Sequence, residues 1–367
     1  METEEKLNLL RQKIEAVDRQ ILGLLNERAE IVLEVDKVKA EIKMESYDPQ
    51  REEEILKRLI LQNSGSFPRE AILPVFGEII SACRSLEVQL TVAYLGPPAT
   101  HTHLACLQHF GNSIQSLAQE SIQDVFEAVE KAKASYGMVP IENSTEGVVN
   151  RTLDVLIESE VKICGEVRIR ISHDLLSRSG RAEDIEKIYS HPQALEQCRK
   201  WLRKTLPHVP LVETVSTAKA AQFAVEDPKA AAIANFSAAR IYDLKVIESQ
   251  IEDYLNNYTR FLILSRENSK RTGRDKTSLL LSIPHTPGSL YQVLRSFSER
   301  GINLTKIESR PVKGRPWEYV FFLDFEGHVT DSQIIETMAE LKKNVLFLKV
   351  LGSYPRNTER EGSHQSR

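Results

Sequence analysis

The sequence predicts a multidomain protein with an all-α N-terminal region, a central α/β region and a small α+β unit at the C-terminal end. Three patterns support this fold class. Apolar residues recur in steps of three and four over residues 3–43. Short strands alternate with helices over residues 91–266. From Thr277 the order is strand, helix, strand, strand, helix, strand, which is the order of ferredoxin-like domains.

Three helices are expected within residues 1–90. Residues 3–43 have no proline and one glycine, so they predict a single helix roughly 60 Å long. Asp48 and Pro49 resemble an N-cap and a first helical position, and they predict a second helix over 49–62. A third helix is predicted over 69–89. Because two short helices cannot cover the long one, we expect long helix to pack on long helix in a dimer.

The later boundaries follow from composition. The polar stretch that ends at Lys276 predicts a linker over 267–276, between the α/β region and the α+β unit at 277–354. Residues 355–367 lack apolar anchors and predict a disordered tail.

Composition excludes several classes of protein. The chain has 48 basic and 52 acidic residues, which argues against a nucleic-acid-binding protein. Its four cysteines form no C-x-x-C pair and read as reduced, buried thiols. It shows no signal-peptide pattern and no apolar run long enough to span a membrane, so we expect a cytoplasmic protein.

One charge interrupts the apolar seam of the first helix. Arg28 lies on the seam, and a charge there is costly unless it has a partner. Lys39 shares its face about 16 Å further along the axis, so both cations can reach a small dianion. Arg11 is too far away on the same helix, but the partner's Arg11 could reach the site in an antiparallel dimer. These cations can also be ordinary snorkelling side chains of a long helix.

The N-terminal region resembles the all-helical chorismate mutases over about 90 residues. The residues that carry the resemblance are Arg11, Arg28, Lys39, Asp48, Arg51 and Glu52. It implies the unimolecular rearrangement of chorismate to prephenate, which needs no nucleophile or cofactor, only a held conformer and stabilised charge. It also implies that the three arginines bind carboxylates, with Arg11 coming from the partner. Lys39 would bind the ether oxygen, and Glu52 the substrate hydroxyl with Asp48 beside it.

The third helix departs from one common version of the pattern. Cys83 and Glu87 stand where some members have serine and glutamine. A carboxylate can donate a hydrogen bond to the ether oxygen only when it is protonated. We therefore expect Glu87 to act as a neutral acid, with an exposed, uninvolved helix residue as the alternative.

The central region places four polar clusters at predicted strand ends, where α/β domains bind ligands. Each alone can be a turn or a helix cap. Together they resemble prephenate dehydratase across residues 91–266, which implies two α/β lobes similar to those of periplasmic binding proteins. The matching residues are Thr100, Asn143, Ser144, Ser190, Gln197, Thr259 and Arg260. The first loop departs from the family, because Pro98 and Ala99 precede Thr100.

The resemblance implies loss of carbon dioxide and the ring hydroxyl from prephenate. Thr259 would lie near the leaving hydroxyl and either donate the proton or orient the group. Arg260 would bind a carboxylate or serve the structure. Asn143, Ser144, Ser190 and Gln197 would supply further contacts. No cofactor motif is found, and His101 and His103 read as a polar loop pair without a third metal ligand.

The C-terminal unit resembles the ACT domain. Its matching segments are Gly288, Ser289 and Leu290, which open a helix, and Glu308, Ser309, Arg310 and Pro311, which end a strand. Free N–H groups at a helix start can bind a carboxylate. The resemblance implies phenylalanine as effector, bound between paired ACT domains; a purely structural dimerisation module is the alternative.

The combined prediction is a homodimeric or larger bifunctional enzyme of phenylalanine biosynthesis, inhibited by phenylalanine, with chorismate and prephenate as substrates. The alternatives are a chain with one working site, a non-catalytic amino-acid-responsive regulator, and a preference for arogenate over prephenate. The mutase on the same chain favours prephenate, since it makes prephenate directly.

Overall fold

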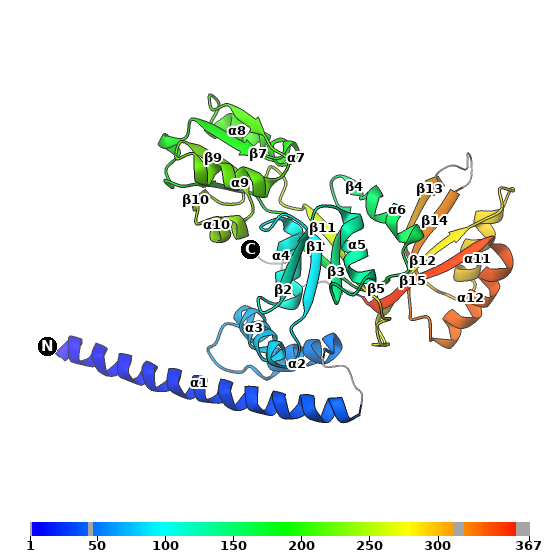
Figure 1. The fold of residues 1–367 in the computed structure, drawn as a ribbon, viewed down its shortest axis with the longest axis horizontal. Coiled ribbons are helices and arrows are strands. Elements are labelled where there is room, and N and C mark those ends of the chain that lie inside the picture. The colour runs from blue at the N-terminus through cyan, green and yellow to red at the C-terminus, as the bar shows by residue number, and fades with distance from the viewer. Residues whose placement is uncertain (1, 43–46, 312–318, 357–367) are drawn as a thin grey trace. The chain divides into compact units, whose positions relative to one another are not determined.

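The computed structural model describes residues 2–42, 47–311 and 319–356 (Figure 1). The predicted tail lies outside the described residues from residue 357 onward. Contacts divide the chain into two compact units. The first consists of residues 1–90 with 110–115, and the second of 91–109 with 116–367.

The first unit contains the three predicted helices, α1 (Glu2–Glu41), α2 (Pro49–Gln62) and α3 (Arg69–Glu87). The predicted cap is present at the start of α2, where the Asp48 carboxylate accepts a hydrogen bond from the Arg51 amide at 3.1 Å. Pro74 lies inside α3, near its start.

The seam of α1 is largely exposed in the single chain. Ten of its apolar side chains have exposed fractions between 44% and 65%: Leu7, Leu10, Ile14, Val17, Ile21, Leu24, Ile31, Val35, Val38 and Ile42. Helices α2 and α3 therefore leave much of this face of α1 open, as the length argument predicts.

The second unit begins with a mixed sheet in the order β2-β1-β3-β11-β5, with β4 paired to β3. Strand β1 is parallel to β3, whereas β11 runs antiparallel to both β3 and β5. The elements of this lobe are β1 (Thr91–Leu95), α4 (His101–Phe110), β2 (Gln115–Gln119), α5 (Ile122–Glu130), β3 (Tyr136–Asn143), β4 (Gly147–Val148), α6 (Asn150–Glu158), β5 (Lys162–Arg170) and β11 (Tyr258–Ser265).

A second sheet, in the order β10-β6-β9-β7-β8, is inserted between β5 and β11. Its elements are β6 (Asp174–Ser177), η1 (Ala182–Asp184), β7 (Lys187–Ser190), α7 (Pro192–Gln197), α8 (Arg199–Thr205), β8 (Leu211–Glu213), α9 (Thr217–Glu226), β9 (Ala230–Ala234), α10 (Phe236–Tyr242) and β10 (Lys245–Glu248). The chain thus leaves the first sheet once and returns once, and this confirms the two-sheet α/β fold.

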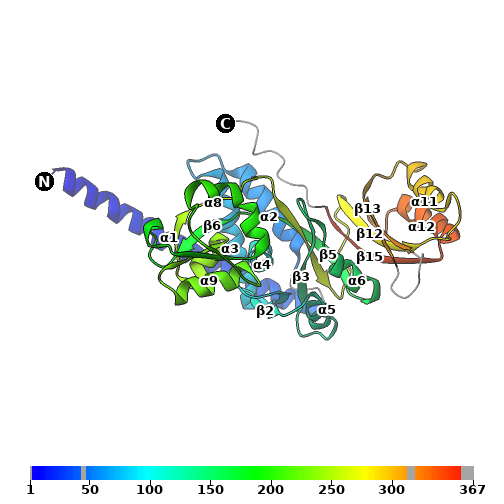
Figure 2. The same cartoon turned by 90° about the horizontal axis from the view of Figure 1, so that it is seen from above.

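The remaining elements have the predicted βαββαβ order and form an antiparallel sheet β13-β14-β12-β15. They are β12 (Asp275–Ser282), α11 (Ser289–Ser298), β13 (Leu304–Pro311), β14 (Tyr319–Glu326), α12 (Ser332–Asn344) and β15 (Phe347–Pro355). Figure 2 shows α11 and α12 close together beside this sheet.

Two boundaries of this unit differ from the sequence prediction. Strand β12 begins at Asp275, so the last two residues of the predicted linker are buried in the sheet. Lys276 is the last residue of a polar stretch in the sequence, yet its ammonium group pairs with the buried Glu166 at 2.9 Å. At the other end β15 runs to Pro355, and the Arg356 amide still bonds to the Arg274 carbonyl at 2.9 Å.

The two faces of the sheet formed by β12–β15 pack on different cores. Leu279 and Leu281 lie in a core with residues of α11 and α12, whereas Leu280 and Leu351 join the core of the first α/β lobe. Strand β15 lies so close to β5 that a Cβ atom placed on Gly352 would be 2.0 Å from the carbonyl oxygen of Ile163. The sheet is therefore docked directly against the lobe that contains β3 and β11.

Candidate active sites

Charged side chains from α1, α2 and α3 converge in the first unit. Lys39 on α1 lies with its ammonium nitrogen 3.9 Å from a carboxylate oxygen of Glu87 on α3. Arg84, also on α3, donates from one nitrogen to both carboxylate oxygens of Glu52 on α2, at 2.6 and 2.8 Å. Three helices thus hold two cations and two carboxylates in one cluster.

Burial raises the pKa of both carboxylates in this cluster. Desolvation raises the pKa of Glu87, whose side chain is 6% exposed, and nearby Asp36 and Glu52 raise it further against the opposing effect of Lys39. Desolvation also raises the pKa of Glu52, although Arg84 opposes it. A raised pKa favours the protonated form of Glu87 that could donate a hydrogen bond.

Arg28 reaches the same cluster from α1. It is close enough to Glu52 to lower the pKa of that carboxyl. One of its terminal guanidinium nitrogens is buried and has no hydrogen-bond partner among the described residues. A buried unpaired donor of a cationic group is costly unless an anion pairs with it.

The other predicted residues of the first unit are less closely gathered. Asp48 caps α2, and Cys83 is buried on α3. The Arg51 side chain is 61% exposed and lies 3.4 Å from Glu54. Arg11 is exposed on α1, and the structure shows no contact between it and the cluster. One chain alone therefore does not bring all the predicted binding groups together.

Sequence reasoning missed Arg84. Its guanidinium is 6% exposed, bonds to Glu52 and also donates to the backbone carbonyl of Phe110. Arg84 could have been found in the same way as Arg28, as a charged residue at an apolar position of a helix. It follows Ile80 by one helical turn on the buried face of α3. A charge on that face needed a partner, and Glu52 is that partner.

In the second unit, Thr259 on β11 lies opposite Asn143 on β3. The Asn143 amide nitrogen donates to the Thr259 hydroxyl oxygen at 2.8 Å and to the Asn257 side-chain oxygen at 3.0 Å. The Asn143 oxygen accepts from the Thr145 amide at 2.9 Å, so the Asn143 side chain is fixed. The Thr259 hydroxyl accepts this bond, and its proton remains available to a substrate.

Ser144 and Thr100 lie beside strand ends, as predicted. The Ser144 hydroxyl accepts from the Tyr258 amide at 2.9 Å, which places it next to the Thr259 strand. The Thr100 hydroxyl accepts from the His103 amide at 3.3 Å at the start of α4. Both hydroxyls therefore stabilise the local backbone in the structure.

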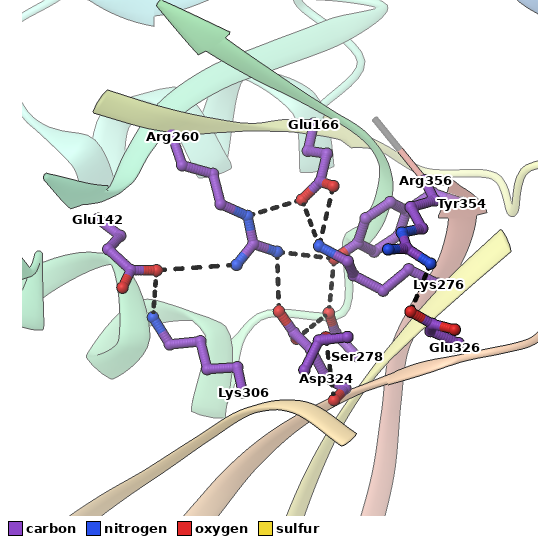
Figure 3. Close-up of polar contacts among 11 residues, drawn as sticks. Glu142, Glu166, Arg260, Lys276, Ser278, Lys306, Asp324, Glu326, Tyr354 and Arg356 are labelled. Carbon is purple, nitrogen blue, oxygen red and sulfur yellow. Dashed lines mark hydrogen bonds and ion pairs between the residues drawn. The ribbon is translucent and has the colours of Figure 1, made fainter. Parts of the chain in front are cut away.

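Arg260 points away from Thr259, and its predicted contact with a substrate carboxylate is not supported. Successive side chains of a strand face opposite sides of the sheet. The Arg260 guanidinium donates to Glu166 at 2.6 Å and to Asp324 on β14 at 2.8 Å (Figure 3). The structural alternative for Arg260 is therefore the one that the geometry favours.

Ser190 and Gln197 are already committed to other partners. The Ser190 hydroxyl is buried and donates to the Ile233 carbonyl at 2.7 Å inside the second sheet. The Gln197 side-chain oxygen lies 2.8 Å from a ring nitrogen of His173. The Ser190 hydroxyl proton is therefore already donated within the sheet, whereas the bond to His173 occupies only the oxygen of the Gln197 amide.

His101 and His103, expected as a polar loop pair, lie instead in the first turn of α4, and they do not converge on one point. His103 accepts from the Ala99 amide at 3.2 Å and stacks on Tyr94. His101 packs edge-on against His173, with 5.7 Å between ring centroids. Burial and the neighbouring His173 lower the pKa of His101 to about 3, so it is neutral.

The two predicted effector segments lie on α11 and β13. Gly288 has a φ of 87°, which favours glycine, and it precedes Ser289 and Leu290 at the start of α11. On β13, the Arg310 guanidinium donates to Asn150 and Asp154, both on α6, at 2.6 Å. Glu308, Ser309 and Pro311 belong to the same strand, whose alternate side chains are exposed.

Comparison with known proteins gives matches along the whole chain. A chorismate mutase type II model matches residues 10–88, a prephenate dehydratase model residues 92–269, and an ACT domain model residues 277–343. A bifunctional chorismate mutase/prephenate dehydratase of Aquifex aeolicus is 48% identical over 356 residues, covering 96% of this chain and 98% of the relative.

Two solved structures resemble the part of the chain beyond the N-terminal helices. A prephenate dehydratase of Arthrobacter aurescens in complex with L-Phe has a TM-score of 0.67 and 36% identity, covering 73% of this chain and 90% of that one. A protein described as a novel type of quorum-quenching acylase has a TM-score of 0.67 and 30% identity, covering 72% of this chain and 97% of that one.

Proposed function

This chain belongs to the family of bifunctional chorismate mutase/prephenate dehydratases, and on that premise we propose how its residues carry out the two reactions. The N-terminal domain rearranges chorismate to prephenate. The central domain converts prephenate to phenylpyruvate, carbon dioxide and water. Phenylalanine inhibits the enzyme through the ACT domain. The buried, unpaired nitrogen of Arg28 and the paired Thr259 and Asn143 are the observations that carry the two site assignments.

In the mutase site the cations hold the substrate dianion in its compact conformer. Arg28 and Arg51 bind carboxylates, together with Arg11 of a second copy. Lys39 and protonated Glu87 donate to the ether oxygen as its charge develops, which lowers the barrier of a reaction without a covalent intermediate. Glu52, held by Arg84 and near Asp48, accepts from the substrate hydroxyl. Cys83 is buried on α3, one residue before Arg84.

In the dehydratase site the ring carboxylate leaves as carbon dioxide, and its bonding electrons pass through the ring and expel the hydroxyl. One proton reaches the departing oxygen, so the products are phenylpyruvate, carbon dioxide and water. Thr259 donates a hydrogen bond to that oxygen, since its own oxygen already accepts from Asn143. Asn143 thereby orients the hydroxyl, and Ser144 and Thr100 lie on the strand ends that border the site.

Glu87 gives the mutase a defined pH dependence. If the protonated carboxyl is the donor, mutase turnover falls as pH rises through the raised Glu87 pKa. The variant Glu87→Gln is expected to flatten this profile, because an amide donates at every pH. The kcat of chorismate consumption measured across pH tests this. A profile unchanged in the variant removes Glu87 from the role.

We also propose that the chain dimerises along α1, since ten apolar side chains of its seam are exposed in the single chain. The double variant Ile14→Lys/Ile21→Lys is expected to give a monomer by light scattering. This variant should lose mutase activity, because the partner's Arg11 no longer reaches the site, and it should keep dehydratase activity. Glu15→Lys, which adds charge to α1 off the seam, is the matched control. A dimeric, mutase-active double variant would refute this interface.

The phenylalanine site is proposed at the start of α11 and the end of β13, between ACT domains of two copies. Exposed Ile307 on β13 and Tyr291 on α11 provide apolar surface for such pairing. A cytoplasmic location is proposed as well, since all four cysteines are free thiols in the structure.

One experiment tests the overall assignment. Purified protein receives chorismate in one reaction and prephenate in another, each with and without phenylalanine. Phenylpyruvate in both, suppressed by phenylalanine, is the expected result. Phenylpyruvate from prephenate alone would refute the mutase site. No product from either substrate would favour the regulator alternative.

A further inference from the structure

Two adjacent strands of the dehydratase lobe present catalytic and non-catalytic residues to opposite faces. The register of β3 and β11 pairs Thr259 with Asn143 and, at the next position, Arg260 with Glu142. Because side chains alternate along a strand, the first pair faces the proposed substrate site and the second faces the opposite side of the sheet. Any force on the second pair therefore acts on the backbone that holds the first.

The ACT domain holds both members of the second pair. Arg260 donates to Asp324 on β14 at 2.8 Å and to the Tyr354 hydroxyl on β15 at 3.1 Å. Glu142 accepts from Lys306 on β13 at 2.7 Å (Figure 3). Three strands of the ACT sheet thus reach the two strands that carry Thr259 and Asn143.

The same cluster is completed by Glu166 and Lys276. Glu166 accepts from Arg260 at 2.6 Å and from Lys276 on β12 at 2.9 Å. Its side chain is 1% exposed; burial alone would raise its pKa, but Arg260 and Lys276 outweigh burial and lower it. The cluster therefore contains three cations and three carboxylates, and displacement of the ACT sheet would leave buried charges unpaired.

Lys306 connects this cluster to the proposed effector strand. It lies on β13, two residues before Glu308 and four before Arg310. Arg310 in turn binds Asp154 on α6, so β13 contacts the dehydratase lobe at two points. A shift of β13 on effector binding would be transmitted to Glu142 through the ion pair with Lys306.

We propose that Lys306, acting through Glu142, and Asp324, acting through Arg260, are positioning residues of the dehydratase reaction. They hold the backbone neighbours of Asn143 and Thr259 from the ACT side, and so set the hydrogen bond that orients the Thr259 hydroxyl. This inference rests on the proposed dehydratase function and adds residues outside its active site.

The test compares Lys306→Met with Lys349→Met in the full chain. Lys349 is a matched control: it lies on β15, its side chain is 11% exposed against 14% for Lys306, and it binds the Ser159 carbonyl just after α6. Both variants lose a buried ammonium group at the same interface. Only Lys306 touches a strand that carries a proposed catalytic residue.

Lys306→Met is expected to lower the dehydratase kcat at least about 5-fold relative to Lys349→Met, with KM for prephenate within about twofold. Lys306→Arg is expected to restore most of the loss, since it keeps a cation near Glu142. Glu142 also lies 3.9 Å from Arg260, so Glu142→Gln weakens two ion pairs, of which Lys306→Met breaks one. The double variant Glu142→Gln/Lys306→Met should therefore be no slower than Glu142→Gln alone. Thermal unfolding of the same samples serves as the folding reference, since the mutase helices belong to the other compact unit.

A kcat for Lys306→Met that matches Lys349→Met would overturn the proposal, as would a loss that Lys306→Arg does not restore. The part that Lys306 plays in transmitting phenylalanine binding is tested separately, by inhibition assays and calorimetry on Lys306→Met. The phenylalanine concentration for half-inhibition should rise at least about 5-fold, while the Kd for phenylalanine measured by calorimetry stays within about twofold. Unchanged inhibition would remove that role and leave positioning intact. Wild-type protein that makes no phenylpyruvate from prephenate would instead refute the proposed function.

Discussion

Replacing Thr259 with alanine is expected to lower the dehydratase kcat by about 10²–10⁴-fold, the usual contribution of a positioned proton donor. The physical reason is the loss of the Thr259 hydroxyl, whose oxygen accepts from Asn143 and whose own proton can then be donated to the leaving group. Mutase activity should be unchanged, since the variant residue belongs to the other compact unit. With chorismate as substrate, prephenate should therefore accumulate, which chromatography of the reaction detects.

Two further variants separate chemistry from stability in this experiment. Thr259→Ser keeps the hydroxyl and should retain most of the turnover. Thr152→Ala removes another buried threonine hydroxyl of the same lobe, which donates to the Pro140 carbonyl at 2.6 Å. It should cost about 1 kcal/mol of unfolding free energy and leave the dehydratase active. Rapid dehydration by Thr259→Ala would refute the assignment of Thr259.

Replacing Arg28 with methionine is expected to lower the mutase kcat/KM by about 10²–10³-fold, as for loss of one strong donor to a developing or fixed anion. The unfolding free energy should stay the same or rise. A buried nitrogen of Arg28 has no hydrogen-bond partner among the described residues, so methionine removes a desolvation penalty without breaking such a bond there. Chorismate consumption and thermal unfolding, measured on the same protein, test both expectations.

The neighbouring cations provide the controls for Arg28. Arg19→Met changes an exposed arginine of α1 and should leave mutase activity and stability unchanged. Arg84→Met, unlike Arg28→Met, should lower the free energy of unfolding, because it leaves the partly buried Glu52 without its ion-pair partner. We expect a loss of roughly 2–3 kcal/mol of unfolding free energy there. Full mutase activity in Arg28→Met would refute the proposed anion site.

The sequence was sufficient for the parts of the fold that depend on local pattern. The uninterrupted seam of α1, the Asp48 cap of α2 and the βαββαβ order of the ACT domain all appear in the structure. Each rests on interactions between residues a few positions apart, or on an alternation that one segment displays by itself. The resemblances then supplied the chemistry that these segments serve.

The sequence could not separate the roles of two adjacent residues, Thr259 and Arg260. Both are among the residues that carry the resemblance to prephenate dehydratase, and both were predicted as site residues. The strand alternation assigns them to opposite faces of β11, and only the position of the ACT sheet shows that the Arg260 face is covered. Arg84 and Lys276 were missed for a related reason, since their carboxylate partners lie far away in the chain.

The sequence by itself therefore determined the order of the domains and most of their secondary structure, because these follow from local periodicity. The two reactions followed from the resemblances to known families. The tertiary structure alone decided which polar residues are occupied by other parts of the protein. Ser190 and Gln197 are bound within the second lobe, Arg260 is bound to the ACT domain, and Arg28 keeps an unpaired nitrogen. A buried polar group is satisfied by whatever the fold brings within hydrogen-bonding distance, and that depends on long-range packing that no single segment encodes.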